Sequence, residues 1–206
     1  MPTHRCPPLV ASVTLLAILL AVGWGAAESA PPYAAEEGDI VFQSLPHAPL
    51  VDAIEGVTQS PWSHCGIVVR DGDDWAVLEA VGPVMVTSFK SWVKHSRDGR
   101  FAAYRLKDRP ENLVARMIAA ARSFLGRPYD IHYRMDDEAI YCSELVQKAF
   151  MQATGRPLGR ARRLGDMNWQ PFEAFIREIE GGALPLDREI ISPQALTESP
   201  EVAKVY

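Results

Sequence analysis

The sequence predicts an α+β fold in which a small antiparallel sheet or half-barrel packs against helices. Short apolar runs separated by turn residues dominate the first half of the domain, which is typical of antiparallel strands. Apolar residues at helical spacing dominate the second half. The 206 residues are 48% hydrophobic and 23% charged, which suits one domain with a sizeable core and excludes disordered and polytopic membrane proteins.

The strands are predicted from apolar runs bounded by turn residues, and the clearest pair forms a hairpin. The turn Asp71-Gly72-Asp73-Asp74 joins the two runs, because Asp-Gly sequences favour a tight reversal of the chain. With Arg70 opposite Trp75, the register places Gly66 directly opposite Glu79. The predicted strands cover residues 40–43, 64–69, 75–80, 84–87, 101–106 and 190–191.

The helices are predicted from their apolar spacing and from capping residues. Ser88 is expected to cap the second helix, and Asp108 the third, with Pro110 in its first turn and Gly126 just past its end. The predicted helices cover residues 47–57, 88–93, 108–125, 142–153 and 168–179.

The N-terminal segment has a different composition and predicts export. An apolar run at 9–22 follows a weakly positive start, and small residues at 25–27 suit a cleavage site, so residues 1–27 are predicted to be a secretory signal peptide. An uncleaved anchor is disfavoured because the run is short for a span of ~20 residues. Residues 28–37 are predicted to be a disordered leader and 38–206 the domain. The protein is expected to be periplasmic or secreted, without stable membrane insertion after cleavage.

Charge and ligand spacing limit the partners and cofactors. The 21 Lys and Arg residues against 26 Asp and Glu residues give a net charge of −5 without a basic stripe, so a nucleic-acid partner is not expected. The chain lacks the paired Cys and His spacing of metal sites, so a zinc ion held by His64, Cys142 and Glu79 is disfavoured. No metal or organic cofactor is predicted.

Cys142 is the strongest candidate for a reactive residue. The residues Cys142, Leu145, Val146, Ala149 and Phe150 lie at helical spacing, so the thiol faces inward at the first turn of its helix. The positive end of the helix dipole favours a thiolate there. The alternative is an inert core cysteine, which is what most free cysteines are.

His64 is the candidate base, and Glu79 is the candidate for the group that orients it. His64 begins an apolar strand and so enters the interior of the domain. The hairpin register places Glu79 diagonally from His64 on the same face, with Gly66 leaving room between them. A carboxylate there can orient the imidazole and stabilise its charged form. A register shift of one residue would move Glu79 to the other face.

Cys65 is expected to be a packed thiol. Side chains alternate along a strand, so His64 and Cys65 point to opposite faces, which moves Cys65 away from a Cys142 that His64 serves. The alternative is a disulfide between Cys65 and Cys142, which an exported protein could form.

Several segments in this order resemble a known family. They are Gly38-Asp39-Ile40-Val41-Phe42-Gln43, Ser63-His64-Cys65-Gly66-Ile67-Val68, Glu79-Ala80, Tyr129-Asp130, Tyr141-Cys142-Ser143-Glu144-Leu145-Val146, and Ile191 to Leu196 through Ser199-Pro200. From Gly38 to its end, the chain resembles the YiiX-like permuted papain-like cysteine hydrolases, which are circularly permuted relatives of the NlpC-type cell-wall peptidases.

The resemblance implies a circularly permuted papain-like fold and a role for each site residue. Cys142 would be the nucleophile, His64 the base and Glu79 the third polar member. Tyr141 would help to position the site or the oxyanion, although a core aromatic is an equal alternative. Tyr129 would line the substrate cleft or pack in the core.

The function expected from these residues is exported, thiol-dependent hydrolysis of an amide or acyl bond. The substrate would be a cell-envelope peptide, such as one from peptidoglycan, or an N-acyl amide or lipid. Acyl transfer instead of hydrolysis stays open. The alternative from another class is a non-catalytic module that binds a peptide or lipid on the same fold. A wall-associated structural protein is disfavoured because the chain lacks repeats.

Overall fold

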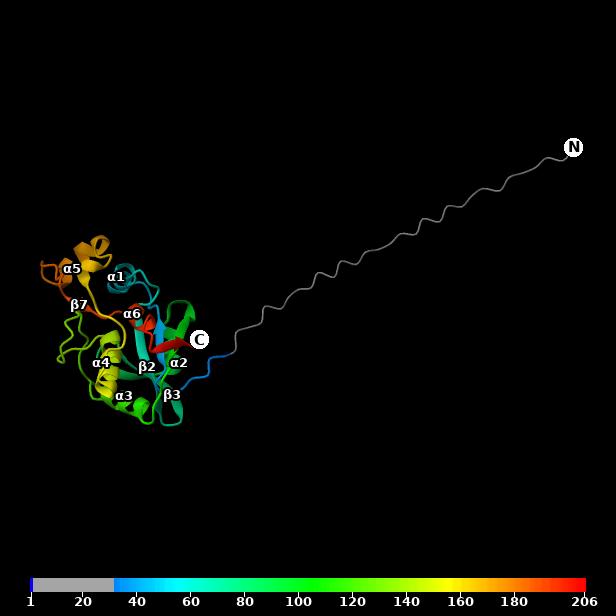
Figure 1. Cartoon of the computed structure of the whole chain (residues 1–206). Helices are drawn as coiled ribbons and strands as arrows, with labels where there is room; N and C mark the ends of the chain where they lie inside the picture. Colours follow the sequence, from blue (N-terminus) through cyan, green and yellow to red (C-terminus); the bar gives the residue numbers. More distant parts are fainter. Residues whose placement is uncertain (2–31) are drawn as a thin grey trace. The chain divides into compact units, whose positions relative to one another are not determined.

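The computed structural model describes Met1 and residues 32–206, and the folded unit runs from Tyr33 to Tyr206 (Figure 1). Apart from Met1, the predicted signal peptide lies outside the described residues, as do residues 28–31 of the predicted leader. Among the residues that are described, no helix is both long and apolar enough to cross a membrane.

A six-stranded sheet forms the centre of the folded unit. Its order is β4-β3-β2-β1-β5-β8, and every neighbouring pair is antiparallel. The six strands are β1 (Ile40–Gln43), β2 (His64–Asp71), β3 (Asp74–Ala80), β4 (Val84–Ser88), β5 (Phe101–Leu106) and β8 (Val202–Lys204). A separate two-stranded ladder joins β6 (Arg162–Arg163) and β7 (Glu189–Ile190). The antiparallel sheet packed against helices confirms the predicted fold class.

The helices cover both faces of the sheet. Figure 1 shows α3 and α4 on one side and α2 on the other. The helices are α1 (Pro49–Thr58), α2 (Phe89–His95), α3 (Leu113–Arg122), α4 (Cys142–Thr154), α5 (Glu173–Ile179) and α6 (Pro193–Thr197). Short 3-10 turns lie at Arg97–Gly99, Leu164–Asp166 and Gln170–Phe172.

The two faces of β2 belong to two hydrophobic clusters. Cys65, Ile67 and Val69 belong to the larger cluster, which includes the apolar residues of α3 and α4. Val68 belongs to the smaller cluster with the buried Trp92 of α2. This alternation follows from the period of two along a strand. The alternation therefore determines which helix packs against each residue of the candidate site.

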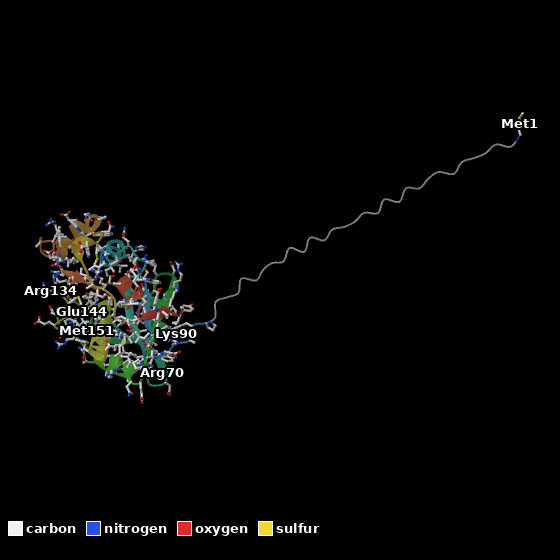
Figure 2. All side chains as sticks on the ribbon, in the orientation of Figure 1. Met1, Arg70, Lys90, Arg134, Glu144 and Met151 are labelled. Carbon is white, nitrogen blue, oxygen red and sulfur yellow. The ribbon has the colours of Figure 1, made fainter. Side chains whose placement is uncertain are left out.

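The hairpin register is the predicted one, with Gly66 opposite Glu79 and Arg70 opposite Trp75. The turn itself is shorter than predicted, because Asp71 still pairs with Asp74 and only Gly72 and Asp73 lie between them. Gly72 has a φ of +61°, which a residue without a side chain adopts readily. Figure 2 labels Arg70 at this end of the hairpin.

The segment from Tyr33 to Glu37 is ordered by packing, so the prediction of disorder is wrong for these residues. The Tyr33 ring stacks on Phe89, with its centroid 5.7 Å away, and its hydroxyl donates to Asp39 over 2.7 Å. Glu36 forms ion pairs with arginines that follow β5 or lie in it. The Ala-, Pro- and Glu-rich composition of the segment predicted disorder, and it gave no indication that the Tyr33 ring would pack against the domain.

The third helix begins later than predicted. It starts at Leu113, and Asn112 holds the capping position with a φ of +65°, so Asp108 is not the N-cap. Asn tolerates this left-handed backbone conformation, which interrupts any helix that began upstream. By contrast, Ser88 caps α2 as predicted, since its hydroxyl accepts a hydrogen bond from the Ser91 N–H.

Candidate active site

Cys142 is the first residue of α4, at the positive end of the helix dipole. Tyr141 precedes it in an extended conformation, and the Tyr141 N–H donates to Glu144 Oε2 over 3.1 Å. This contact satisfies one of the N–H groups that a helix start leaves without a partner. The Cys142 side chain is buried and forms part of the wall of a pocket. Its placement agrees with the sequence prediction.

His64 and Glu79 form a buried hydrogen bond. His64 Nε2 lies 2.6 Å from Glu79 Oε2, and both side chains are almost fully enclosed. Thr87 of β4 and Trp92 of α2 also lower the pKa of Glu79. The structure therefore brings these two predicted residues together, and it adds two polar neighbours of Glu79 that the sequence analysis missed.

Gly66 provides the space for this pair. A Cβ atom at position 66 would lie 2.4 Å from Val77 Cγ1, 3.0 Å from the Leu78 carbonyl oxygen and 3.2 Å from Glu79 Cβ. A side chain at this position would displace β3 where it carries the carboxylate. The predicted role of Gly66 is confirmed by these contacts.

His64 also forms a hydrogen bond with Cys142. Because Glu79 occupies Nε2, Nδ1 is the ring nitrogen that is left for the sulfur. Burial alone would lower the pKa of His64, but the hydrogen bonds to Cys142 and Glu79 raise it to about 9. Burial likewise opposes ionisation of Glu79, yet its hydrogen bond to His64 lowers its pKa overall. The imidazole is therefore held in its charged form.

The pKa of the Cys142 thiol is well below its ordinary value. A hydrogen bond from Cys65 contributes most, burial opposes it, and the hydrogen bond and charge of His64 add to the lowering. A lowered thiol pKa beside a raised imidazole pKa describes a thiolate paired with an imidazolium. This is the state in which a cysteine is nucleophilic at neutral pH.

Cys65 lies next to Cys142, which corrects the expectation that strand alternation moves it away. The alternation itself holds, but α4 covers the Cys65 face of β2, so Cys142 meets Cys65 there and His64 at the strand end. Both the thiol and the backbone N–H of Cys65 form hydrogen bonds with Cys142. The two cysteines are free and buried, as the packed-thiol interpretation predicted.

Tyr141 is a core aromatic whose hydroxyl ties down the C-terminal segment. The hydroxyl accepts a hydrogen bond from the Ile191 N–H over 3.1 Å, and the ring packs 4.6 Å from the ring of Tyr133. The hydroxyl of Ser143 donates to the Ile191 carbonyl over 2.8 Å. These contacts favour a positioning role for Tyr141. Tyr129 is also in the core, with its hydroxyl 3.2 Å from that of Tyr133.

An apolar pocket opens beside Cys142. In Figure 1, α1 and α5, which supply much of its wall, lie near each other at the top of the folded unit. Its apolar walls come mainly from Leu50, Ala53, Ile54, Val57, Phe175, Ile176, Ile179, Leu164, Met167 and Ile190. At its polar edge, Arg188 pairs with Glu180 over 2.5 Å and His132 Nδ1 lies 3.5 Å from the same carboxylate. The sequence analysis missed this pocket because its residues have the spacing of ordinary core positions.

No group of three or more His, Cys, Asp or Glu side chains in the described part of the chain is placed to hold a metal ion. The described residues therefore do not fit a metal site.

Comparisons with known proteins agree with the fold. The sequence model of a family described as permuted papain-like amidase enzymes, YaeF/YiiX, C92 family, matches residues 34–206. The uncharacterized protein YiiX of Escherichia coli K12 is 32% identical over 173 residues, which cover 82% of this chain and 85% of that protein. A crystal structure titled metalloprotein YiiX, from Escherichia coli O157:H7, superposes with a TM-score of 0.80 at 31% identity, covering 84% of this chain and 98% of that one. The chain therefore belongs to the YaeF/YiiX family of permuted papain-like amidases.

Proposed function

We propose that this protein hydrolyses amide bonds with Cys142 as the nucleophile, His64 as the general acid and base, and Glu79 as the group that orients His64. The observation that supports this most strongly is the continuous contact from Glu79 through His64 to Cys142 at the start of α4. Membership of an amidase family supports the hydrolase role in general.

The reaction would take place in two stages. The Cys142 thiolate attacks the carbonyl carbon, and the backbone N–H groups at the start of α4 stabilise the oxyanion. His64 gives its proton to the leaving amine as the C–N bond breaks. The neutral imidazole then takes a proton from water, whose oxygen attacks the thioester carbon. The acid leaves, and the thiolate and imidazolium are restored.

The apolar pocket favours an acyl group as the part of the substrate that enters beside Cys142. Apolar side chains from α1 and α5 face the pocket, and its charged residues are already paired with each other. A highly charged cell-wall peptide would lose hydration there without compensation. We therefore propose an N-acyl amide over a peptidoglycan peptide. An ester or thioester of the same acyl group could react by the same route.

We also propose that the protein is exported. The proposal rests on the apolar run and the small residues that follow it near the N-terminus. Fusion of residues 1–27 to a reporter that is active only outside the cytoplasm would test it. Reporter activity with cleavage after Ala27 would support export, and an inactive reporter with an intact segment would contradict it.

The first experiment on the site is alkylation of the purified folded protein with iodoacetamide from about pH 5 to about pH 9, with each modified cysteine mapped by mass spectrometry. We expect Cys142 to react fast near neutral pH and Cys65 to react slowly. His64→Ala should slow the reaction of Cys142. His47→Ala is the matched control, because the His47 side chain is 70% exposed and lies outside this group of contacts.

If Cys142 is inert in the wild-type protein, the catalytic proposal is wrong. The pocket would then fit a module that binds an acyl group without reaction. Ligand-dependent thermal stabilisation by N-acyl amides, without any release of amine, would show that second function.

A further inference from the structure

Cys65 is a second sulfur in direct contact with the proposed nucleophile. It lies on β2 under the start of α4, and its thiol forms a hydrogen bond with the sulfur of Cys142. Both residues belong to one buried cluster, so the contact is held from both sides by packed strand and helix. The proposed amide hydrolysis gives Cys65 no chemical step.

The two sulfurs differ in access and in charge. Cys142 forms part of the pocket wall, whereas Cys65 is fully buried and is not part of that wall. Burial, together with the nearby Cys142, raises the pKa of the Cys65 thiol, while the pKa of Cys142 is lowered. A small oxidant that enters the pocket therefore meets a thiolate first and a protonated thiol behind it. Peroxides oxidise thiolates rather than protonated thiols, and the pocket gives a small peroxide a route to Cys142.

We propose that Cys142 and Cys65 form a peroxide-modification site in which Cys65 is the resolving thiol. The Cys142 thiolate attacks one peroxide oxygen, the O–O bond breaks, and the products are a Cys142 sulfenic acid and hydroxide, or an alkoxide from an organic peroxide. The Cys65 sulfur then attacks the Cys142 sulfur, the S–O bond breaks, and the hydroxyl leaves as water with the Cys65 proton. In total, one peroxide is reduced and two thiols become one disulfide.

The first step prepares the second. Burial raises the pKa of Cys65 throughout, but the further rise caused by the charge of Cys142 ends once Cys142 is a neutral sulfenic acid. His64, which lies beside Cys142, can relay the Cys65 proton to the leaving oxygen by giving up its own proton and taking that of Cys65. The disulfide would remove the nucleophile reversibly and protect it from further oxidation to sulfinic acid, which is not reversed by thiols.

This inference rests on the proposed thiolate at Cys142, and its test distinguishes a failure of the inference from a failure of the proposed function. The reduced folded protein is treated with hydrogen peroxide, and then with dithiothreitol, as wild type, Cys65→Ala, Cys65→Ser and Cys142→Ala. Before oxidation, iodoacetamide labelling of Cys142 shows whether the wild type and the two Cys65 variants are folded and reactive, and circular dichroism shows whether Cys142→Ala is folded. Intact mass and peptide mapping follow the oxidation.

In the wild type we expect a loss of two hydrogens, a cross-linked pair of peptides containing Cys65 and Cys142, and full recovery of labelling with dithiothreitol. In Cys65→Ala and Cys65→Ser we expect a gain of two oxygens at Cys142 and no recovery. In Cys142→Ala we expect Cys65 to stay reduced.

Normal labelling of the untreated wild type followed by sulfinic acid at Cys142, without a cross-link, would overturn this inference and leave the proposed hydrolase intact. Equal recovery in the wild type and both Cys65 variants would also overturn it. Absence of labelling in the untreated wild type would overturn the proposed function, and this inference with it.

Discussion

His64 contacts two acidic groups, the Glu79 carboxylate and the Cys142 thiol, and its charge state should control the reaction. The raised pKa of about 9 means that the imidazole keeps its proton through neutral pH and loses it as the pH rises through that value. Hydrolysis needs this proton for the leaving amine, whereas alkylation needs only the thiolate. The two reactions should therefore differ at alkaline pH.

We expect kcat/KM for an N-acyl amide to fall as the pH rises through about 9. The rate of Cys142 alkylation should stay level over the same range, because the thiolate persists. Both rates should fall at acid pH when the thiolate takes up a proton. Parallel pH profiles measure the difference, and an alkaline limb near the usual histidine pKa of 6.5 would contradict the account.

Substitution of Gly66 should disturb the candidate site more than the rest of the fold. In Gly66→Ala the new methyl would meet Val77 and the Leu78 carbonyl, so β3 must shift where it carries Glu79. We expect slower alkylation of Cys142 and a loss of about 1–3 kcal/mol in the free energy of unfolding. Gly82→Ala is the control, because a Cβ there meets nothing within 4 Å. Equal alkylation rates and equal stabilities in the two variants would contradict the clash that we expect at position 66.

At the scale of single residues, the sequence predicted the His64–Glu79 pair because the position of the hairpin turn fixes the strand register. The register in turn fixes the face of the sheet on which each side chain lies. It misjudged Cys65 because alternation states which face a side chain is on, not which helix covers that face. Trp92 and Thr87 lower the pKa of Glu79 from elements whose packing no local sequence pattern indicates.

The start of α4 places both the nucleophile and a buried carboxyl. Burial raises the pKa of Glu144 to about 7, although Lys148 lies 3.3 Å away. Between the ordinary value of 4.5 and about 7, the folded protein holds a proton there that the unfolded chain has released. The stability contributed by Glu144 is therefore present below pH 4.5 and is lost as the pH rises through about 7.

We expect Glu144→Gln to weaken this decline of stability between about pH 4.5 and 7, since the amide can still accept from the Tyr141 N–H and has no proton to lose. Denaturant unfolding at several pH values measures the slope. Glu178→Gln is a control on the exposed surface of the last turn of α5. Identical slopes in the wild type and Glu144→Gln would contradict the raised pKa.

Elements with several consistent signals were predicted well. The helix at 142–154 has an apolar stripe and ends at Gly155, which has a φ of +73°. The short elements α6 and β8 were missed because three to five residues carry too little periodicity. Their place is set by pairing and packing, as where Arg105 in β5 lies opposite Ala203 in β8.

At the scale of the whole molecule, α1, α5 and the start of α4 enclose one pocket. If the pocket receives the acyl group, each buried methylene should add about 0.8 kcal/mol, or about a fourfold gain in kcat/KM. We expect this increase along a series of amides with lengthening acyl chains until the pocket is filled.

Ile176→Arg should abolish that dependence on chain length, because it places a charge in the apolar wall contributed by α5. Met151→Arg is the matched control, since Met151 is an exposed apolar residue of α4 outside the pocket (Figure 2). Alkylation of Cys142 should be normal in both variants. A length dependence that survives Ile176→Arg would place the acyl group elsewhere.

The pocket could not be predicted from the sequence, although the fold could. Segments far apart in the chain, such as 50–57 and 175–179, form its wall, and their apolar residues look like core positions in one dimension. Tyr33 gives the converse case, since a segment that looked disordered is held by rings from three other segments.

The most direct test of the central claim is the ionisation of Cys142, measured as the difference in ultraviolet thiolate absorbance between the wild type and Cys142→Ser during a pH titration. The account predicts a thiolate that is already present at neutral pH, with a midpoint well below the ordinary thiol value of ~8.5, and an upward shift in His64→Ala. A wild-type Cys142 that ionises only at ~8.5 or above, unchanged by His64→Ala, would contradict the thiolate–imidazolium pair on which the proposed hydrolase rests.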